Sequence, residues 1–201
     1  MTNFQKSLCI VLVTSVISGC APAVIVGGTA INAAHDRRTL GSFVEDQNIE
    51  LKGYDALSKV EGMDEQANVS ITSYNGVVLL SGQTPTPEMS RQAEDAVRNV
   101  PKVRKIHNEL SIAAPSSIGI RSSDTWVTTK VKTNLFKVDN HKNFDPTRVK
   151  VVTENGTVYL MGIVNRTEAD DVVAVVRKIK GVQRVVKIFE YMNTTQQTES
   201  P

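Results

Sequence analysis

The stretch VSITSYNGVVLLSG, residues 69–82, aligns without a gap to VKVVTENGTVYLMG, residues 149–162. Both alternate apolar and polar residues on either side of an Asn-Gly pair, Asn75-Gly76 in the first and Asn155-Gly156 in the second. Asn-Gly tolerates the positive φ angles of a type I′ turn, so each stretch predicts a two-stranded β-hairpin. The chain therefore contains an internal repeat, and this repeat determines the fold.

A helix is predicted after each hairpin, followed by a short alternating strand. In the first copy, Thr86 is the expected N-cap and Pro87 the first helical residue. In the second copy, Thr167 is the expected N-cap. The apolar residues expected to face the core are Ala93, Ala96, Val97 and Val100 in the first copy and Val172, Val175, Val176 and Ile179 in the second.

A helix is also predicted before each hairpin. The second copy has the clearer pattern, because Val127, Val131 and Leu135 recur every four residues, and Ser123 or Asp124 is the expected cap. The first copy has a weaker pattern, formed by Ile49, Tyr54, Ala56 and Leu57.

These elements predict an α+β fold with two tandem units. Each unit has the order αββαβ, with a small mixed sheet packed against two helices. We expect the units at residues 46–112 and 123–192, joined by a linker at residues 113–122. Residues 20–45 are expected to form a tether, with a short helical piece near residues 30–34, and residues 193–201 a disordered tail.

The first twenty residues, MTNFQKSLCIVLVTSVISGC, have the pattern of a signal peptide. One lysine precedes a short apolar run, and Ser18-Gly19 before Cys20 resembles a bacterial lipobox. The resemblance implies removal of residues 1–19 and attachment of acyl chains to Cys20, and Ala21 in place of an aspartate implies sorting to the outer membrane. The alternative is an ordinary secretory signal in which the cysteine is incidental.

Composition and motifs argue against several classes of function. The formal net charge of +2 over 201 residues gives no sign of nucleic-acid binding. The three histidines, His35, His107 and His141, lack the cysteine or paired carboxylates of a metal or acid-base site. We therefore expect no enzymatic activity, no metal and no cofactor other than the lipid on Cys20.

The only tryptophan, Trp126, lies beside the expected core stripe of its helix, in line with Lys130 and Asn134. An aromatic side chain at such a boundary favours the headgroup region of a membrane, and Lys130, Lys132 and Lys137 add positive charge. The alternative is that the indole packs between the two units. The first copy has Asn48 at the matching place.

The paired units resemble BON domains, and a lipobox followed by two of them resembles a family of dual BON-domain outer-membrane lipoproteins. The resemblance rests on residues 36–47, 123–131 and 153–162, and runs from Cys20 to about Met192. It implies a periplasm-facing, lipid-anchored protein that supports envelope integrity, is recruited to the division site and binds anionic phospholipid, chiefly phosphatidylglycerol, through its second BON domain. The candidate lipid-binding residues are Trp126, Val127, Lys130, Val131, Asn134 and Lys137.

A periplasmic adaptor that binds envelope or outer-membrane assembly proteins, without lipid specificity, is the alternative function. The asymmetry of the repeats separates the two hypotheses, because only the second unit carries the tryptophan and the lysines around it.

Overall fold

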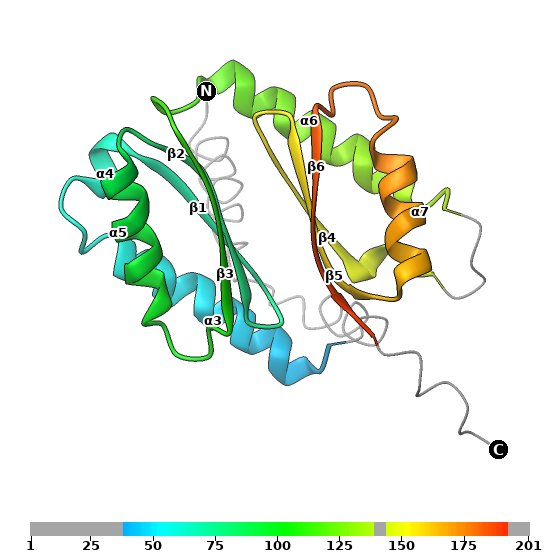
Figure 1. The fold of residues 1–201 in the computed structure, drawn as a ribbon, viewed down its shortest axis with the longest axis horizontal. Helices are drawn as coiled ribbons and strands as arrows, with labels where there is room; N and C mark the ends of the chain where they lie inside the picture. Colours follow the sequence, from blue (N-terminus) through cyan, green and yellow to red (C-terminus); the bar gives the residue numbers. More distant parts are fainter. Residues whose placement is uncertain (1–37, 139–143, 193–201) are drawn as a thin grey trace, which may run out of the picture. The chain divides into compact units, whose positions relative to one another are not determined.

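The computed structural model describes residues 38–138 and 144–192. Two modules follow one another along the chain, each with the predicted order αββαβ, to which the first adds a short second helix and the second a 3-10 turn (Figure 1). The first consists of α3 (Leu40–Leu57), the short α4 (Met63–Gln66), β1 (Asn68–Tyr74), β2 (Val77–Thr84), α5 (Pro87–Arg98) and β3 (Lys105–Ile112). The second consists of α6 (Ile118–Leu135), the 3-10 turn η1 (Pro146–Arg148), β4 (Val149–Glu154), β5 (Thr157–Val164), α7 (Arg166–Val176) and β6 (Arg184–Tyr191).

Each module contains a three-stranded mixed sheet, as predicted. The strand orders are β1-β2-β3 and β4-β5-β6, with the hairpin antiparallel and the last pair parallel. The parallel pair requires a crossover connection, which α5 and α7 provide. Asn75, Gly76, Asn155 and Gly156 all have positive φ, which confirms the type I′ turn at both hairpins.

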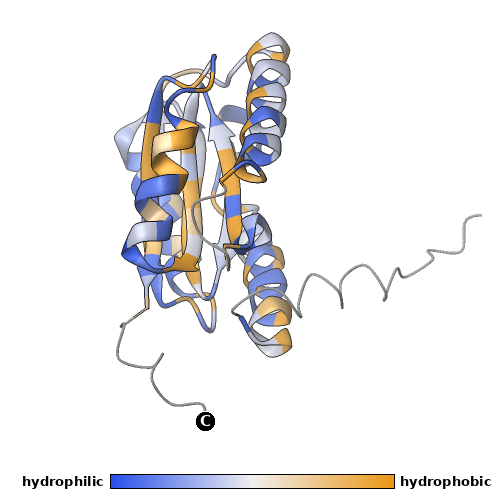
Figure 2. Ribbon diagram, turned by 90° about the vertical axis from the view of Figure 1, so that its right-hand side faces the viewer, coloured by the Kyte–Doolittle hydropathy of each residue, from blue (hydrophilic) through white to orange (hydrophobic). Residues whose placement is uncertain are grey.

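The helices of each module cover one face of its own sheet (Figure 1). The core stripe of α6, formed by Val127, Val131 and Leu135, packs with Val158 and Leu160 of β5. The first module repeats this arrangement, with Ile49, Leu57, Val78, Leu80, Ala93 and Val97 in its core. Helices α3, α6 and α7 carry hydrophobic and hydrophilic residues together, whereas parts of the strands are continuously hydrophobic (Figure 2).

One aspartate per module holds the hairpin turn. The Asp124 carboxylate accepts hydrogen bonds from the backbone N–H groups of Asn155, at 2.7 Å, and Gly156, at 2.9 Å. The predicted role of Ser123 or Asp124 as helix cap is therefore wrong. Helix α6 begins at Ile118, capped by Ser117, so residues 118–122 belong to the helix and not to the linker.

Two other helix starts also differ from the predictions, and one agrees. Helix α3 begins at Leu40, capped by Thr39, so residues 40–45 are helical and not part of the tether. Helix α7 is capped by Asn165, not by the predicted Thr167. Thr86 does cap α5, with Pro87 at its first position. The predicted helical piece at residues 30–34 and the predicted tail lie outside the described residues.

The two modules belong to one compact unit, and their sheets pack against each other. Tyr74, Val77 and Leu79 form an apolar cluster with Tyr159, Met161 and Ile188. Alternate residues of β2 and β5 thus face the helices of their own module or the opposite sheet, and both strands are buried along most of their length. We call this second apolar layer the seam.

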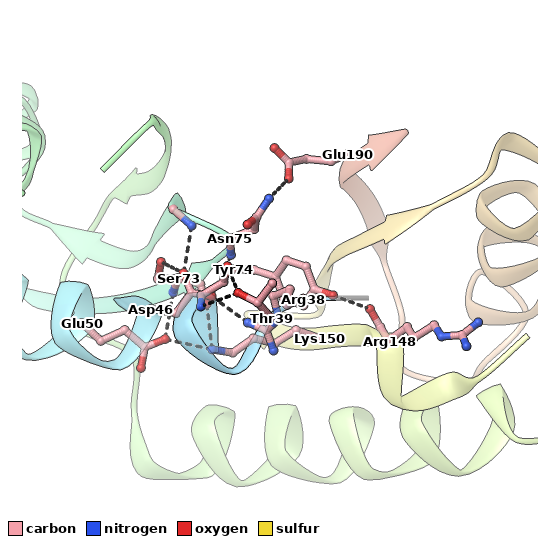
Figure 3. Close-up of polar contacts among 12 residues, drawn as sticks. Arg38, Thr39, Asp46, Glu50, Ser73, Tyr74, Asn75, Arg148, Lys150 and Glu190 are labelled. Carbon is pink, nitrogen blue, oxygen red and sulfur yellow. Dashed lines mark hydrogen bonds and ion pairs between the residues drawn. The ribbon is translucent and has the colours of Figure 1, made fainter. Parts of the chain in front are cut away.

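Polar contacts border the seam (Figure 3). Lys150 forms an ion pair with Glu50, with 2.8 Å between the ammonium nitrogen and a carboxylate oxygen. The Tyr74 hydroxyl donates to the backbone carbonyl of Arg148 at 3.2 Å. The Arg38 guanidinium lies 3.8 Å from the centroid of the Tyr74 ring and pairs with buried Asp46. The start of α3 is therefore attached at the edge of the seam.

Candidate functional site

The exposed side of α6 carries an aromatic and a basic residue in contact. The Trp126 side chain is 64% exposed, which is unusual for the largest aromatic residue. The Lys130 ammonium nitrogen lies 3.6 Å from the centroid of its ring. The alternative in which the indole packs between the two modules is therefore wrong, because the seam contains other residues and the ring faces solvent.

Two of the candidate lipid-binding residues are not on this surface. Val127 and Val131 are only 2% and 0% exposed, since they form the core stripe of α6. They cannot contact a membrane, and the prediction that they bind lipid is wrong. Burial of this stripe fixes the rotation of α6, and that rotation turns Trp126 outward.

The remaining candidates, Asn134 and Lys137, lie along the same side of the helix. The Asn134 side-chain amide donates to the backbone carbonyl of Lys130 at 2.8 Å. The Lys137 ammonium in turn donates to the Asn134 side-chain oxygen at 3.3 Å. The exposed face of α6, which we define as Trp126, Lys130, Asn134 and Lys137, is thus partly ordered by contacts within it.

Sequence reasoning missed residues beside this face. An open groove of about 420 Å³ separates α6 from the end of α7, and it is lined by Lys130, Asn134, Lys137, Val175, Lys178, Ile179 and Lys180. The Lys130 ammonium crosses the groove and donates to the backbone carbonyl of Lys180 at 2.5 Å. The sequence signal for the wall beyond α7, which contains Lys178 and Lys180, is the alternating RKIKG at residues 177–181. Phe136, 68% exposed directly after α6, was missed as well.

The groove carries uncompensated positive charge. Within residues 38–138 and 144–192, none of its four lysines forms an ion pair with a carboxylate. Its lining contains no acidic residue. An anion that enters the groove would therefore meet donors and no carboxylate.

The first module lacks the aromatic part of this face. Asp46 accepts hydrogen bonds from the turn amides of Asn75 and Gly76, just as Asp124 does in the second module, so the two aspartates are equivalent. In that alignment Asn48 of the first module is equivalent to Trp126 of the second, as the sequence predicted. The two modules share a fold but present different surfaces.

The part of the chain that the structure describes gives no indication of a metal centre. Among the described residues, no three metal-ligating side chains lie together. His107 is half-buried in β3, where burial, together with nearby Lys105, lowers its pKa. His35 and His141 lie outside the described residues. No helix in the described part of the chain is long and apolar enough to span a membrane.

Comparison with known proteins identifies the modules. The BON domain family matches residues 45–114 and residues 123–193. The chain belongs to the BON-domain family. The two BON domains coincide with the two modules of the structure, and the resemblance noted in the sequence is confirmed.

Relatives of similar length align with most of the chain. The chain is 37% identical over 190 residues to the outer membrane lipoprotein DolP of Haemophilus influenzae, covering 94% of this chain and 97% of that protein. It is 36% identical over 157 residues to a 21 kDa hemolysin of Actinobacillus pleuropneumoniae, covering 78% and 79% of the two chains. The osmotically-inducible protein Y of Escherichia coli is 26% identical, with 91% and 94% covered. The predicted class, a dual BON-domain outer-membrane lipoprotein of the DolP type, is thus confirmed.

Proposed function

We propose that this protein binds anionic phospholipid, chiefly phosphatidylglycerol, through the exposed face of α6 in its second BON domain. The observation that carries the proposal is the solvent-exposed Trp126 with Lys130 against its ring, at a position where the first BON domain has Asn48. Through this binding the protein would be recruited to the division site and would support envelope integrity.

The contacts have the right strength for lipid selection. An indole that enters the interfacial region buries part of its 150–250 Å², which contributes a few kcal/mol at about 25 cal/mol per Å². Each lysine near an anionic surface adds about 1 kcal/mol. This is enough to favour one lipid composition over another, and it is small beside the attachment that acyl chains provide.

The acyl chains on Cys20 would act as the anchor. Cys20 lies outside the described residues, and its lipidation is part of the proposal. Several chains at about 0.8 kcal/mol per buried CH₂ hold a protein on a bilayer without any help from α6. The anchor keeps α6 at a high local concentration near the membrane, so weak contacts can determine which lipid patch the protein occupies.

The test uses the unlipidated mature chain, residues 20–201 with Cys20→Ala. We expect Trp126→Glu to abolish binding to phosphatidylglycerol micelles, because it replaces the aromatic contact with a repelled carboxylate. Circular dichroism should show the fold unchanged, since the side chain is exposed. Exposed Thr125→Glu, one residue away, is the charge-matched control. Unchanged micelle binding by Trp126→Glu would reject the proposal.

A second candidate function is that of an adaptor for envelope proteins, and one observation on α3 favours it. Leu40, Val44, Leu51 and Tyr54 are all exposed, and their spacing places them on one side of the helix. Such a stripe can pack against a helix of a partner. The adaptor hypothesis predicts that Val44→Asp with Leu51→Asp abolishes capture of an envelope protein, while Trp126→Glu leaves it intact. Capture that depends on Trp126 instead would count against it.

A further inference from the structure

The groove between α6 and the end of α7 has the chemistry of a phosphate-binding site. Lys130 and Lys137 line one wall, and Lys178 and Lys180 line the other. Asn134 and the half-buried Val175 and Ile179 complete the lining, and the last two add apolar surface. Four ammonium groups beside an apolar patch match a ligand that has a phosphate next to a glycerol ester.

Lys178 and Lys180, on the wall at the end of α7, are specific to the second BON domain. The backbone N–H groups of Arg104 and Gln183 donate to the carbonyls of Gly76 and Gly156, both at 2.8 Å, which makes the two segments equivalent. On that alignment Asn99 and Pro101 of the first domain stand where the second has Lys178 and Lys180.

The wall of the groove that α6 forms also differs between the two domains. When Asp46 is aligned with Asp124, the residues of the first domain that are equivalent to Lys130 and Lys137 are Lys52 and Lys59. Lys59, however, forms an ion pair with Asp55 at 2.6 Å. The first domain therefore has half the lysines at this place, and one of them is already neutralised.

We propose that this groove binds the phosphodiester headgroup of an anionic phospholipid, with Lys178 and Lys180 as its selective contacts. The inference rests on the proposed function and adds a second element to it: α6 supplies the interfacial aromatic residue, and the end of α7 supplies the far side of the phosphate site. Lys130 links the two parts, because it contacts both the Trp126 ring and the Lys180 carbonyl. A less specific explanation is that Lys178 and Lys180 only complement the negative end of the α7 dipole.

The experiment compares two double variants of the unlipidated mature chain. Lys178→Gln with Lys180→Gln removes two charges from the groove. Lys187→Gln with Arg177→Gln removes two exposed charges from the same domain, at residues that do not line the groove. Both variants should keep the fold by circular dichroism. Vesicles of phosphatidylglycerol mixed with phosphatidylcholine are the ligand, and co-sedimentation of the protein with the vesicles reports binding in every variant, including Trp126→Glu.

We expect the groove variant to raise the vesicle Kd about 25-fold, or about fivefold for each lysine. The control variant should raise it no more than about threefold, because its charges lie away from the bound headgroup. An equal loss in both variants would mean that only overall charge matters and would overturn the groove proposal. If the groove variant binds like the wild type while Trp126→Glu does not bind, the proposed function stands and the groove proposal falls. If the wild type does not bind, both fail.

A second arm separates membrane lipid from free phosphate. NMR shifts of Lys178 and Lys180 amides are followed with phosphatidylglycerol micelles and, separately, with inorganic phosphate at equal phosphate concentration. Large shifts with the lipid and small ones with inorganic phosphate are expected. Equal shifts with both would overturn the assignment of a lipid headgroup as the occupant.

Discussion

Two aspartates show how a single residue can determine a turn in this fold. Asp46 and Asp124 are buried, and each accepts two backbone hydrogen bonds from its Asn-Gly turn. A buried carboxylate is costly unless its lone pairs are satisfied, and the turn amides satisfy them here. Each aspartate thereby links the first helix of its BON domain to the hairpin that follows.

Asp124→Ala should therefore destabilise the protein by about 2–4 kcal/mol, because two turn amides lose a charged acceptor in a buried place. Asp124→Asn should cost roughly half as much, since it keeps one acceptor oxygen. Urea unfolding followed by circular dichroism measures both. Asp64→Ala, at an exposed position of α4, is the control and should change stability by less than about 0.5 kcal/mol. Equal effects of Asp64→Ala and Asp124→Ala would contradict this account.

At the scale of elements, the helix starts are set by capping residues and not by the first apolar residue of a stripe. Helix α7 begins with a capping box. The Asn165 side chain accepts from the backbone N–H of Glu168 at 2.8 Å, and the Glu168 carboxylate accepts from the backbone N–H of Asn165 at 2.8 Å. Thr167, which the sequence predicted as the cap, is exposed within the first turn.

Asn165→Ala should cost about 1–2 kcal/mol, because one orphan N–H of the helix start loses its acceptor. Thr167→Ala at the neighbouring exposed position should be nearly neutral. Thermal unfolding of the two variants beside the wild type provides the comparison. The reverse order of stability would restore the sequence-based assignment of Thr167 as the cap.

The periodicity of apolar residues explains which elements could be predicted from the sequence. The hairpins and the core stripe of α6 follow from strict periodicity, and the structure confirms them. The early turns of α3 and α6 could not be predicted, because Leu40, Val44 and Ile118 are exposed and add nothing to the buried stripe of their helix. Trp126 was recognisable as a boundary residue by its offset from the stripe. The basic alternation that contains Lys178 and Lys180 is visible in the sequence, but only the fold brings the end of α7 beside α6.

At the scale of the molecule, each sheet is buried on two sides for different reasons. One face covers the core of its own BON domain, and the other forms the seam. Sequence alternation alone does not reveal the seam, because continuous apolar runs such as Val77–Leu80 fit any strand that is buried on both faces. Since α6 packs on the face of its sheet opposite the seam, docking of the domains and the proposed lipid binding use separate surfaces.

This separation makes a final prediction about Met161, which is 1% exposed and lies in the seam. Met161→Asp should break the docking, because an unpaired carboxylate would be buried between two apolar sheets. Each BON domain keeps its own core, so calorimetry should change from one unfolding transition in the wild type to two in the variant. Lys150→Gln, which removes only a border ion pair, should keep a single transition.

Vesicle binding by Met161→Asp should stay within about threefold of the wild type, since Trp126 and the groove do not touch the seam. Loss of lipid binding in Met161→Asp with the second domain still folded would show that the two surfaces are coupled.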